Sequence, residues 1–197
     1  MISRLFLVKS STSHTAADFN IKSFASSSGR MDVIARAIIS ALRLRNNIRK
    51  NVTFLGVLEG PPDPPKLIRA CGEELHYLPD CEIEIAKILV SLLKGNNVRG
   101  FHLERKSFKT IITEFFESSE YAIYYLEKDG VDIRKASFPL DKKLLFILGD
   151  HLGLDVESEK WIRDLKIPII SLGPKFYFTS HCITLVNEEL DRLKFFS

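Results

Sequence analysis

Two short apolar runs in the last third of the chain, each ending at a glycine, constrain the fold most strongly. They are FILGDHLG (146–153) and IPIISLGPK (167–175). Short runs that are apolar throughout are typical of strands buried on both faces of a sheet. A glycine turn after such a strand leaves backbone N–H and C=O groups beside a concave surface, where open α/β proteins usually bind small molecules. Gly149 and Gly173 are therefore the first candidates for a binding site.

The rest of the chain alternates predicted strands with segments that have the apolar period of helices. Strands are predicted at 2–8, 51–60, 98–106, 121–127, 144–149 and 167–173, and a hairpin is predicted at 66–78. Helices are predicted at 31–46, 82–95, 107–119, 155–166 and 180–194. Hydrophobic residues make up 45% of the chain, enough for an ordinary globular core. The order predicts an α/β sandwich with a mostly parallel sheet, formed by a single domain over residues 1–197.

Local signals set the expected ends of these elements. The predicted helix N-caps are Asp80, Ser107 and either Thr179 or Ser180. Gly95 is predicted to end a helix, and a turn at 128–130 is predicted to end the strand before it. Residues 9–30 are rich in Ser and Thr and are predicted to form one long loop. Loops of that length are uncommon in compact domains unless they are functional.

Composition argues against several classes of protein. No apolar run approaches the roughly 18 to 20 residues that a membrane-spanning helix needs, so no membrane association is expected. The start of the chain has a short apolar patch that is interpreted as a strand and not as a signal peptide, which favours a cytoplasmic location. Cys71, Cys81 and Cys182 form no CxxC pair, and with His76 they match no zinc spacing. Reduced thiols and no bound metal are expected.

Charge is distributed unevenly along the chain. Residues 1–50 hold nine Lys and Arg against two Asp, a formal charge of +7 within a chain whose total is +3, so the remainder carries −4. A concentrated basic block suits a phosphate backbone, and it equally suits a solvated helix face. Both interpretations stay open from composition alone.

Familiar nucleotide signatures are missing from the glycine turns. The turn 149–153 has the form GxxxG and lacks the central glycine of the dinucleotide fingerprint. Gly173, Pro174 and Lys175 are followed by Phe176, where a P-loop needs Ser or Thr. Neither GxSxG nor HExxH occurs. What remains is a site of backbone turns, which suits an adenine or a small polar cofactor held by main-chain hydrogen bonds.

Four segments together carry a resemblance to a known family. They are GRMDV (29–33), LGDH (148–151), SLGPK (171–175) and SHCITLVNEELD (180–191). In this combination the chain resembles the archaeal tRNA pseudouridine-54 N1-methyltransferases, a branch of the SPOUT superfamily. The resemblance implies a C-terminal trefoil knot within residues 121–197, a homodimer, and S-adenosylmethionine bound in the knot through three loops. It also implies methylation of pseudouridine 54 in the tRNA T-loop. The concentrated positive charge makes the basic loop and helix at 9–50 the expected RNA-facing part.

The resemblance also implies roles for individual residues. The cofactor contacts that it implies are Leu126, Gly149, Leu172, Gly173, Pro174, Lys175, Phe176 and Cys182. Contact without nucleophilic chemistry is expected for Cys182, which is also a plausible buried small side chain. Arg36, Arg43, Arg45 and Arg49 are the expected tRNA contacts.

Arg30 and Asp32 are the expected catalytic pair, because loss of the N1 proton needs a base or a cation that stabilises the ring oxygens. The alternatives are a phosphate contact for Arg30 and a helix-start charge for Asp32. The roles of Asp150, His151 and His181, the group that accepts the proton, and whether both dimer sites act at once are left open. Two other functions also stay open: methylation of ribosomal RNA pseudouridine, and RNA binding without catalysis.

Overall fold

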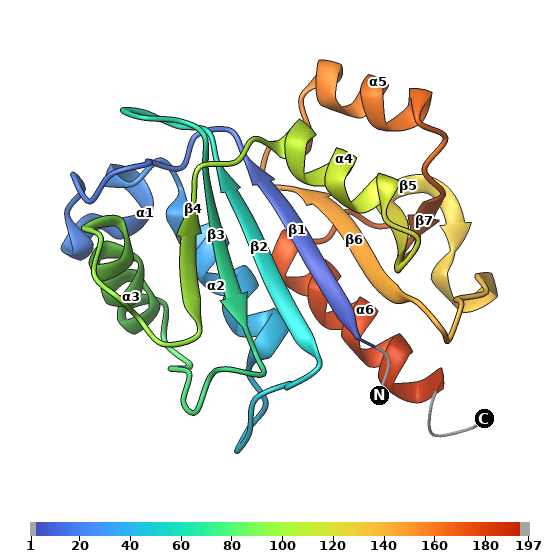
Figure 1. The fold of residues 1–197 in the computed structure, drawn as a ribbon, viewed down its shortest axis with the longest axis horizontal. Coiled ribbons are helices and arrows are strands. Elements are labelled where there is room, and N and C mark those ends of the chain that lie inside the picture. The colour runs from blue at the N-terminus through green and yellow to red at the C-terminus, as the bar shows by residue number, and fades with distance from the viewer. Residues whose placement is uncertain (1–2, 194–197) are drawn as a thin grey trace.

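Seven strands form one sheet in the computed structural model, which describes residues 3–193 (Figure 1). The strands are β1 (Arg4–Ser10), β2 (Val52–Leu58), β3 (Lys66–Cys71), β4 (Phe101–Glu104), β5 (Tyr121–Asp132), β6 (Lys143–Gly149) and β7 (Ile169–Ser171). Their order across the sheet is β4-β3-β2-β1-β6-β5-β7. The neighbours β2, β1, β6, β5 and β7 are parallel, and β3 is antiparallel to both β2 and β4. The predicted mixed α/β class with a mostly parallel sheet is confirmed.

Helices cover both faces of this sheet (Figure 1). The longer helices are α2 (Met31–Leu42), α3 (Glu82–Leu93), α4 (Phe108–Glu117), α5 (Val156–Asp164) and α6 (Thr179–Leu193). Phe6 and Val8 of β1 join one buried cluster with α2, α3 and α6, whereas Leu7 joins a second cluster with α4 and α5. Because alternate residues of a strand point to opposite faces, a strand covered on both sides must be apolar throughout. This double cover explains the continuous apolar runs of the sequence.

The long loop before α2 is more ordered than the sequence indicates. It contains two short helices, η1 (Ile21–Ser23) and α1 (Phe24–Ser27). Thr12 Oγ1 donates a hydrogen bond to the Gly29 carbonyl at 2.8 Å. A Cβ at Gly29 would lie 1.8 Å from the Thr12 carbonyl oxygen, and its φ is +64°, so only glycine fits there. The two ends of the loop are thereby fixed against each other beside β1.

Two predicted turns differ from the structure. The hairpin predicted at 66–78 is wrong, because β3 pairs with β2 and β4. Leu75 and Leu78 lie outside any strand and pack into the buried cluster that contains Phe6 and Val8. The turn predicted at 128–130 lies inside β5, as an irregularity in its pairing with β7 between Leu126 and Val131. Both errors arise where tertiary packing overrides a local turn signal.

The predicted helix caps are confirmed only in part. Ser107 accepts a hydrogen bond from the Thr110 N–H, and Gly95 follows α3 with a φ of +85°. Cys81, and not Asp80, is the N-cap of α3, and it makes no side-chain cap bond. Thr179 and Ser180 lie inside the first turn of α6. Ile2 and Lys194, at the ends of two predicted elements, lie outside the described residues. Among residues 3–193, no helix is long and apolar enough to cross a membrane.

Candidate functional site

A cavity of about 380 Å³ lies at the carboxyl ends of β5, β6 and β7. It is formed by the chain segments that follow these three neighbouring strands, as expected for ligand sites of open parallel sheets. Seven of the eight predicted cofactor contacts line it: Leu126, Gly149, Leu172, Gly173, Lys175, Phe176 and Cys182. Pro174 belongs to the same loop but is outside the lining. The structure thus brings together residues that are up to 56 positions apart in the chain, from Leu126 to Cys182.

The loop after β6 folds back tightly on itself. A Cβ at Gly149 would lie 2.1 Å from the Gly153 carbonyl carbon, so no larger residue fits without moving the backbone. The Gly149 carbonyl accepts a hydrogen bond of 3.0 Å from Thr179 Oγ1, which ties the loop to the start of α6. Gly149 therefore joins two walls of the cavity.

Asp150 holds the other side of this loop, and its role was open from the sequence. Only 6% of the residue is exposed. One carboxylate oxygen accepts from Ser10 Oγ at 3.0 Å and from the Ser11 N–H at 3.1 Å, and the other accepts from the Leu152 N–H at 2.9 Å. Since both oxygens are occupied, Asp150 anchors the loop to the end of β1.

Cys182 contributes an uncharged thiol to the cavity. Burial, together with the nearby Glu127 carboxylate, raises the pKa of this thiol to about 11. Its sulfur lies 3.8 Å from the Tyr177 carbonyl oxygen, which is within reach of a weak S–H hydrogen bond. A thiol with this pKa is protonated at neutral pH, and the thiol form is a poor nucleophile. The geometry fits a packing contact better than covalent chemistry.

Glu127 is the main lining residue that the sequence analysis missed. Its carboxylate accepts a hydrogen bond of 3.2 Å from the Tyr125 hydroxyl and one of 2.7 Å from the Lys128 N–H. Its position directly after Leu126, at the end of an apolar run, was the signal that could have identified it. It places a negative charge in a cavity that also has the apolar walls Leu148 and Ile170.

A second cavity, of about 320 Å³, adjoins the first. Its lining comprises Arg30, Val33, Arg36, Asp150, His151, Phe176, Tyr177, Phe178, Thr179 and Ser180. Five of these residues, from the loop after β6 and from the segment before and at the start of α6, also line the first cavity. The two hollows are therefore parts of one site, the first richer in backbone turns and the second in cationic and aromatic side chains.

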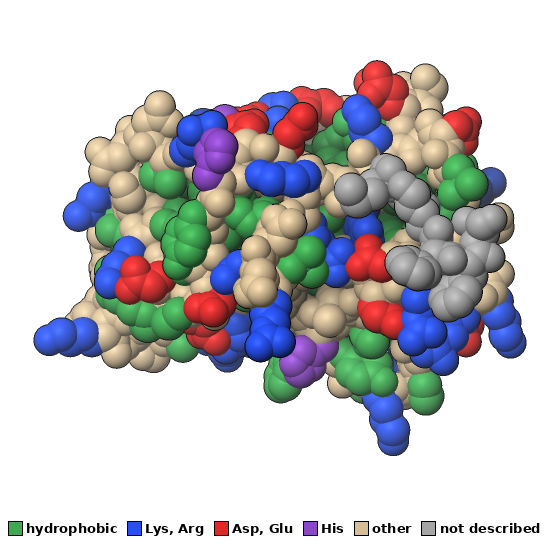
Figure 2. Space-filling view, turned by 90° about the horizontal axis from the view of Figure 1, so that it is seen from below, with side chains coloured by type: hydrophobic (Ala, Val, Ile, Leu, Met, Phe, Trp, Pro, Cys, Tyr) green, Lys and Arg blue, Asp and Glu red, His purple; other side chains and the backbone are tan. Residues whose placement is uncertain are grey.

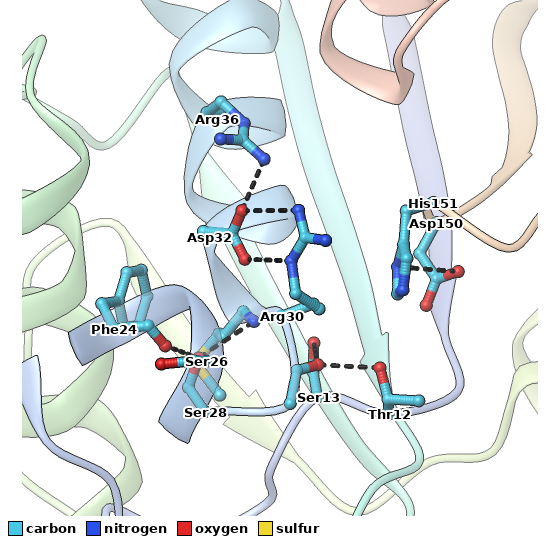
Figure 3. A network of polar contacts seen from close by, with 12 residues as sticks. Thr12, Ser13, Phe24, Ser26, Ser28, Arg30, Asp32, Arg36, Asp150 and His151 are labelled. Atoms are coloured by element: carbon cyan, nitrogen blue, oxygen red, sulfur yellow. Dashed lines mark hydrogen bonds and ion pairs between the residues drawn. The ribbon is translucent and has the colours of Figure 1, made fainter.

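Arg30 and Asp32 form a fixed ion pair at this second cavity (Figure 3). Arg30 Nε and Nη2 donate to the two oxygens of Asp32 at 2.9 and 3.1 Å, and Arg36 Nη2 donates at 2.5 Å. The Asp32 side chain is 3% exposed, whereas those of Arg30 and Arg36 are 42% and 40% exposed. Burial alone would raise the pKa of Asp32, but the two guanidiniums outweigh it and hold this pKa below its usual value. Asp32 is thus a structural anion for both arginines.

The other predicted RNA contacts lie at the opposite end of α2. Arg43 follows this helix, whose twelve residues span about 18 Å. Arg49 pairs with Asp191 at 2.6 Å, close to where the buried Arg4 pairs with the same carboxylate. Arg43 and Arg45 line a hollow of their own. Figure 2 shows this lower end of the molecule, where Lys and Arg side chains lie beside Asp and Glu in place of a continuous basic surface.

The structure therefore divides the basic block of the sequence. Arg30 and Arg36 face the candidate site, while Arg43, Arg45 and Arg49 lie at the other end of the sheet. Arg4 and Lys9 are buried in ion pairs, Arg4 with Asp191 and Lys9 with Glu59 and Asp155. A linear charge count does not distinguish these three situations.

One group of metal-ligand types occurs among the described residues, away from the cavities. Cys71, Glu74 and His102 have ligand atoms within 4.8 Å of one another. His102 Nε2 and Glu74 Oε2 are 2.8 Å apart, and burial raises the pKa of the Cys71 thiol to about 11. The three side chains thus form a hydrogen-bonded group with a protonated thiol. His76 and Cys81, of the spacing tested in the sequence, are not part of it.

Comparisons with known proteins place this chain among RNA methyltransferases. Residues 3–195 match a family described as "Putative SAM-dependent RNA methyltransferase". Two similar proteins are the tRNA (pseudouridine(54)-N(1))-methyltransferases of Pyrococcus abyssi and Methanococcus aeolicus. They are 38% and 36% identical, and each alignment covers 96% of this chain and 98% of the relative.

Solved structures agree with the fold. Archaeoglobus fulgidus Nep1 bound to S-adenosylhomocysteine is 12% identical, with a TM-score of 0.67 over 98% of this chain and 99% of that one. Ribosomal RNA small subunit methyltransferase E of Neisseria gonorrhoeae, bound to S-adenosylmethionine, is 11% identical with a TM-score of 0.52, over 97% and 66% of the two chains. At these identities the likeness concerns the fold. The near-complete match to the sequence relatives shows the family: the chain belongs to the tRNA (pseudouridine(54)-N(1))-methyltransferases.

Proposed function

We propose that this protein transfers a methyl group from S-adenosylmethionine to N1 of pseudouridine 54 in the T-loop of tRNA. The observation that carries the proposal is the cavity at the ends of β5, β6 and β7, which seven of the eight expected cofactor contacts line. Membership of a family whose relatives carry this activity in their names supports the substrate.

The first cavity has the chemistry that this cofactor requires. Leu126, Leu148 and Leu172 provide apolar walls for an adenine ring, and the glycine turns present backbone groups to its polar edge. Glu127 supplies a carboxylate for the cationic part of the molecule, and the neutral Cys182 thiol adds a small uncharged contact. When bound, S-adenosylmethionine supplies an electrophilic methyl group. Pro174, outside the lining, is proposed to shape the loop that holds it.

In this proposal Arg30 is the cation that faces the substrate, and Asp32 holds it in position through two hydrogen bonds. Asp32 has both carboxylate oxygens engaged by guanidinium groups, so it is a poor proton acceptor. Its role is to position Arg30, whose side chain remains partly exposed at the second cavity. A guanidinium held there stabilises the negative charge that develops on the ring oxygens as N1 loses its proton.

The remaining expectations complete the proposal. We also propose a trefoil knot within residues 121–197. The hydrogen bond from Thr179 to the Gly149 carbonyl, which joins the segment after β7 to the loop after β6, supports it. A homodimer is supported by large apolar side chains exposed around the cavities, at Leu152, Phe176 and Phe178, which a second copy would cover. The RNA-facing part spans residues 9–50, and a tRNA substrate implies work in the cytoplasm.

The RNA contacts are proposed at both ends of α2. Arg36 lies at the second cavity, close to where the target nucleotide must enter. Arg43, Arg45 and Arg49, at the far end, would contact phosphates of the tRNA body, since sequence-independent phosphate contacts position an RNA without reading its bases.

The test is methylation of defined tRNAs. The protein is incubated with labelled S-adenosylmethionine and tRNA that carries or lacks pseudouridine 54, and the methyl group is mapped by nuclease digestion and mass spectrometry. The expected product is N1-methylpseudouridine at position 54, formed only on the pseudouridine-containing tRNA. Equal methylation of unmodified uridine would contradict the N1 chemistry. RNA binding without any methylation would instead support a non-catalytic RNA-binding protein.

A further inference from the structure

His151 lies where the two cavities meet. Both cavities have Asp150, His151, Phe176, Tyr177 and Thr179 in their linings. His151 follows Asp150 in the tight loop after β6, and its side chain keeps part of its surface exposed. A group at this junction is close to both a ligand of the first cavity and a ring held in the second.

The carboxylates near the junction are already engaged. Both oxygens of Asp32 accept hydrogen bonds from guanidiniums, and both oxygens of Asp150 accept from the chain around the loop. Thr179 directs its hydroxyl to the Gly149 carbonyl. Imidazole is the side chain most often used as a general base, and His151 contributes one to the linings of both cavities.

The Asp150 carboxylate lies beside this imidazole (Figure 3). His151 Nδ1 lies 3.6 Å from Asp150 Oδ1, longer than a hydrogen bond but within ion-pair distance. A buried carboxylate at this distance stabilises an imidazolium as it forms, as the aspartate of a catalytic triad does for its histidine. The side chain of Asp150 is fully buried, so this charge is not screened by water.

We infer that the second cavity receives the target ring of pseudouridine and that His151 accepts its N1 proton. This inference rests on the proposed function. The N1–H bond breaks, the proton moves to an imidazole nitrogen of His151, and the electron pair stays on N1 to form the new N–C bond. The S–CH3 bond of the methyl donor breaks at the same time, and its electron pair leaves with sulfur as a neutral thioether. Charge is conserved, because His151 gains one positive charge and the methyl donor loses one. The imidazolium then returns its proton to water.

The charged groups around His151 fit this role. Asp150, on its own loop, favours the imidazolium. Arg30 and Arg36, from the start of α2, both pair with Asp32, and Arg36 also pairs with Glu82 at 3.3 Å, so the cluster is neutral overall. The Arg30 guanidinium stays partly exposed at the second cavity, where it faces the ring oxygens. Across the first cavity, the cavity wall carries one acidic and two basic groups, which are Glu127, Lys128 and Lys175. Proton acceptor and oxygen-stabilising cations thus lie on different elements around one hollow.

The central experiment compares two histidine variants under single-turnover conditions. His151→Gln should lower the methylation rate of pseudouridine-containing tRNA by about 100-fold or more, the usual range for loss of a general base. Cofactor and tRNA affinities, measured by calorimetry and filter binding, should stay within about threefold because the loop is held by Asp150 and not by His151. His181→Gln is the matched control, since His181 lies outside both linings and contacts Phe178; its rate should equal that of the wild type.

Two further readouts separate proton transfer from a structural role. Added imidazole should restore part of the rate of His151→Ala and leave the wild type unchanged. Imidazole ¹⁵N resonances of His151, assigned by their loss in His151→Gln, should shift when a T-loop hairpin containing pseudouridine binds.

The outcomes test the role of His151 separately from the proposed methyltransferase function. Any of three results would overturn the role of His151. The first is a methylation rate of His151→Gln within threefold of the wild type. The others are a rate loss in His151→Ala that added imidazole does not restore, and His151 resonances that do not shift when the hairpin binds. Absence of methylation by the wild type itself would instead refute the proposed function, so the two failures are distinguishable.

Discussion

Replacing Asp32 with asparagine removes the charge that holds Arg30 and Arg36 and keeps the shape of the side chain. The side chain is 3% exposed and accepts three hydrogen bonds from guanidiniums. Breaking a buried ion pair costs about 3 to 5 kcal/mol when the remaining charge stays buried. Here the two guanidiniums are 42% and 40% exposed and regain water, so the cost is reduced to about 1 to 2 kcal/mol.

A second contribution comes from the helix. Asp32 is the acidic residue in the first turn of α2, where a negative charge stabilises the helix dipole by about 0.3 to 1 kcal/mol. The expected decrease in the free energy of unfolding is therefore about 1.3 to 3 kcal/mol, measured by urea denaturation at pH 7. Asp18→Asn is the control, because Asp18 pairs with His14 on the surface and should cost less than about 0.5 kcal/mol.

The contribution of Asp32 to the free energy of unfolding should depend on pH in a defined direction. The folded-state pKa of Asp32 lies below its ordinary value of 3.8, so its contribution is fully present above that value and is lost as pH falls through the folded pKa. The stability difference between wild type and Asp32→Asn should stay constant from pH 8 to 5 and begin to shrink only below about 4. A difference under 0.5 kcal/mol at pH 7, or one that changes between pH 8 and 5, would refute this assignment of Asp32 as an ionised anchor.

Three other changes test separate parts of the site. Gly149→Ala places a Cβ 2.1 Å from the Gly153 backbone and should lower cofactor affinity at least tenfold in calorimetry, with unchanged affinity counting against the glycine turn as a cavity wall. Cys182→Ala should keep the methylation rate within about tenfold, and neither protein should show a thiol limb in the rate profile between pH 6 and 9, because the pKa of this thiol is about 11. The double change Arg43→Glu and Arg45→Glu should weaken tRNA binding at low salt without altering cofactor affinity, and equal tRNA affinity in a filter-binding assay would remove this end of α2 from the RNA surface.

The parts of the fold that the sequence predicted are those that local physics determines. Runs such as the one ending at Gly149 must be buried strands, and Ser107 has the side chain that caps a helix start. The hairpin at 66–78 failed because β3 found its partners in distant strands, β2 and β4. Strand order across the sheet is likewise a property of long-range packing, which no local pattern of residues contains.

The candidate site shows the same limit at the level of single side chains. The cofactor loops were predicted because glycine turns and a family resemblance mark them in the sequence. Glu127 was missed, because charged residues commonly follow strands, and only the fold shows that this one lines a cavity. The sequence also does not show whether a carboxylate is buried and hydrogen-bonded, which decides whether it acts as a base or as an anchor.

Asp32 and Asp150 illustrate why that distinction matters for the mechanism. Each carboxylate lies beside the second cavity, and by residue type alone each is a candidate base. Each has both oxygens occupied by hydrogen-bond donors, so a proton placed on either carboxylate would displace a bond that holds a loop or a helix start. A proton acceptor must change its charge without dismantling the site around it. His151 meets that condition, because one carboxylate supports it and no described hydrogen bond of the loop depends on it.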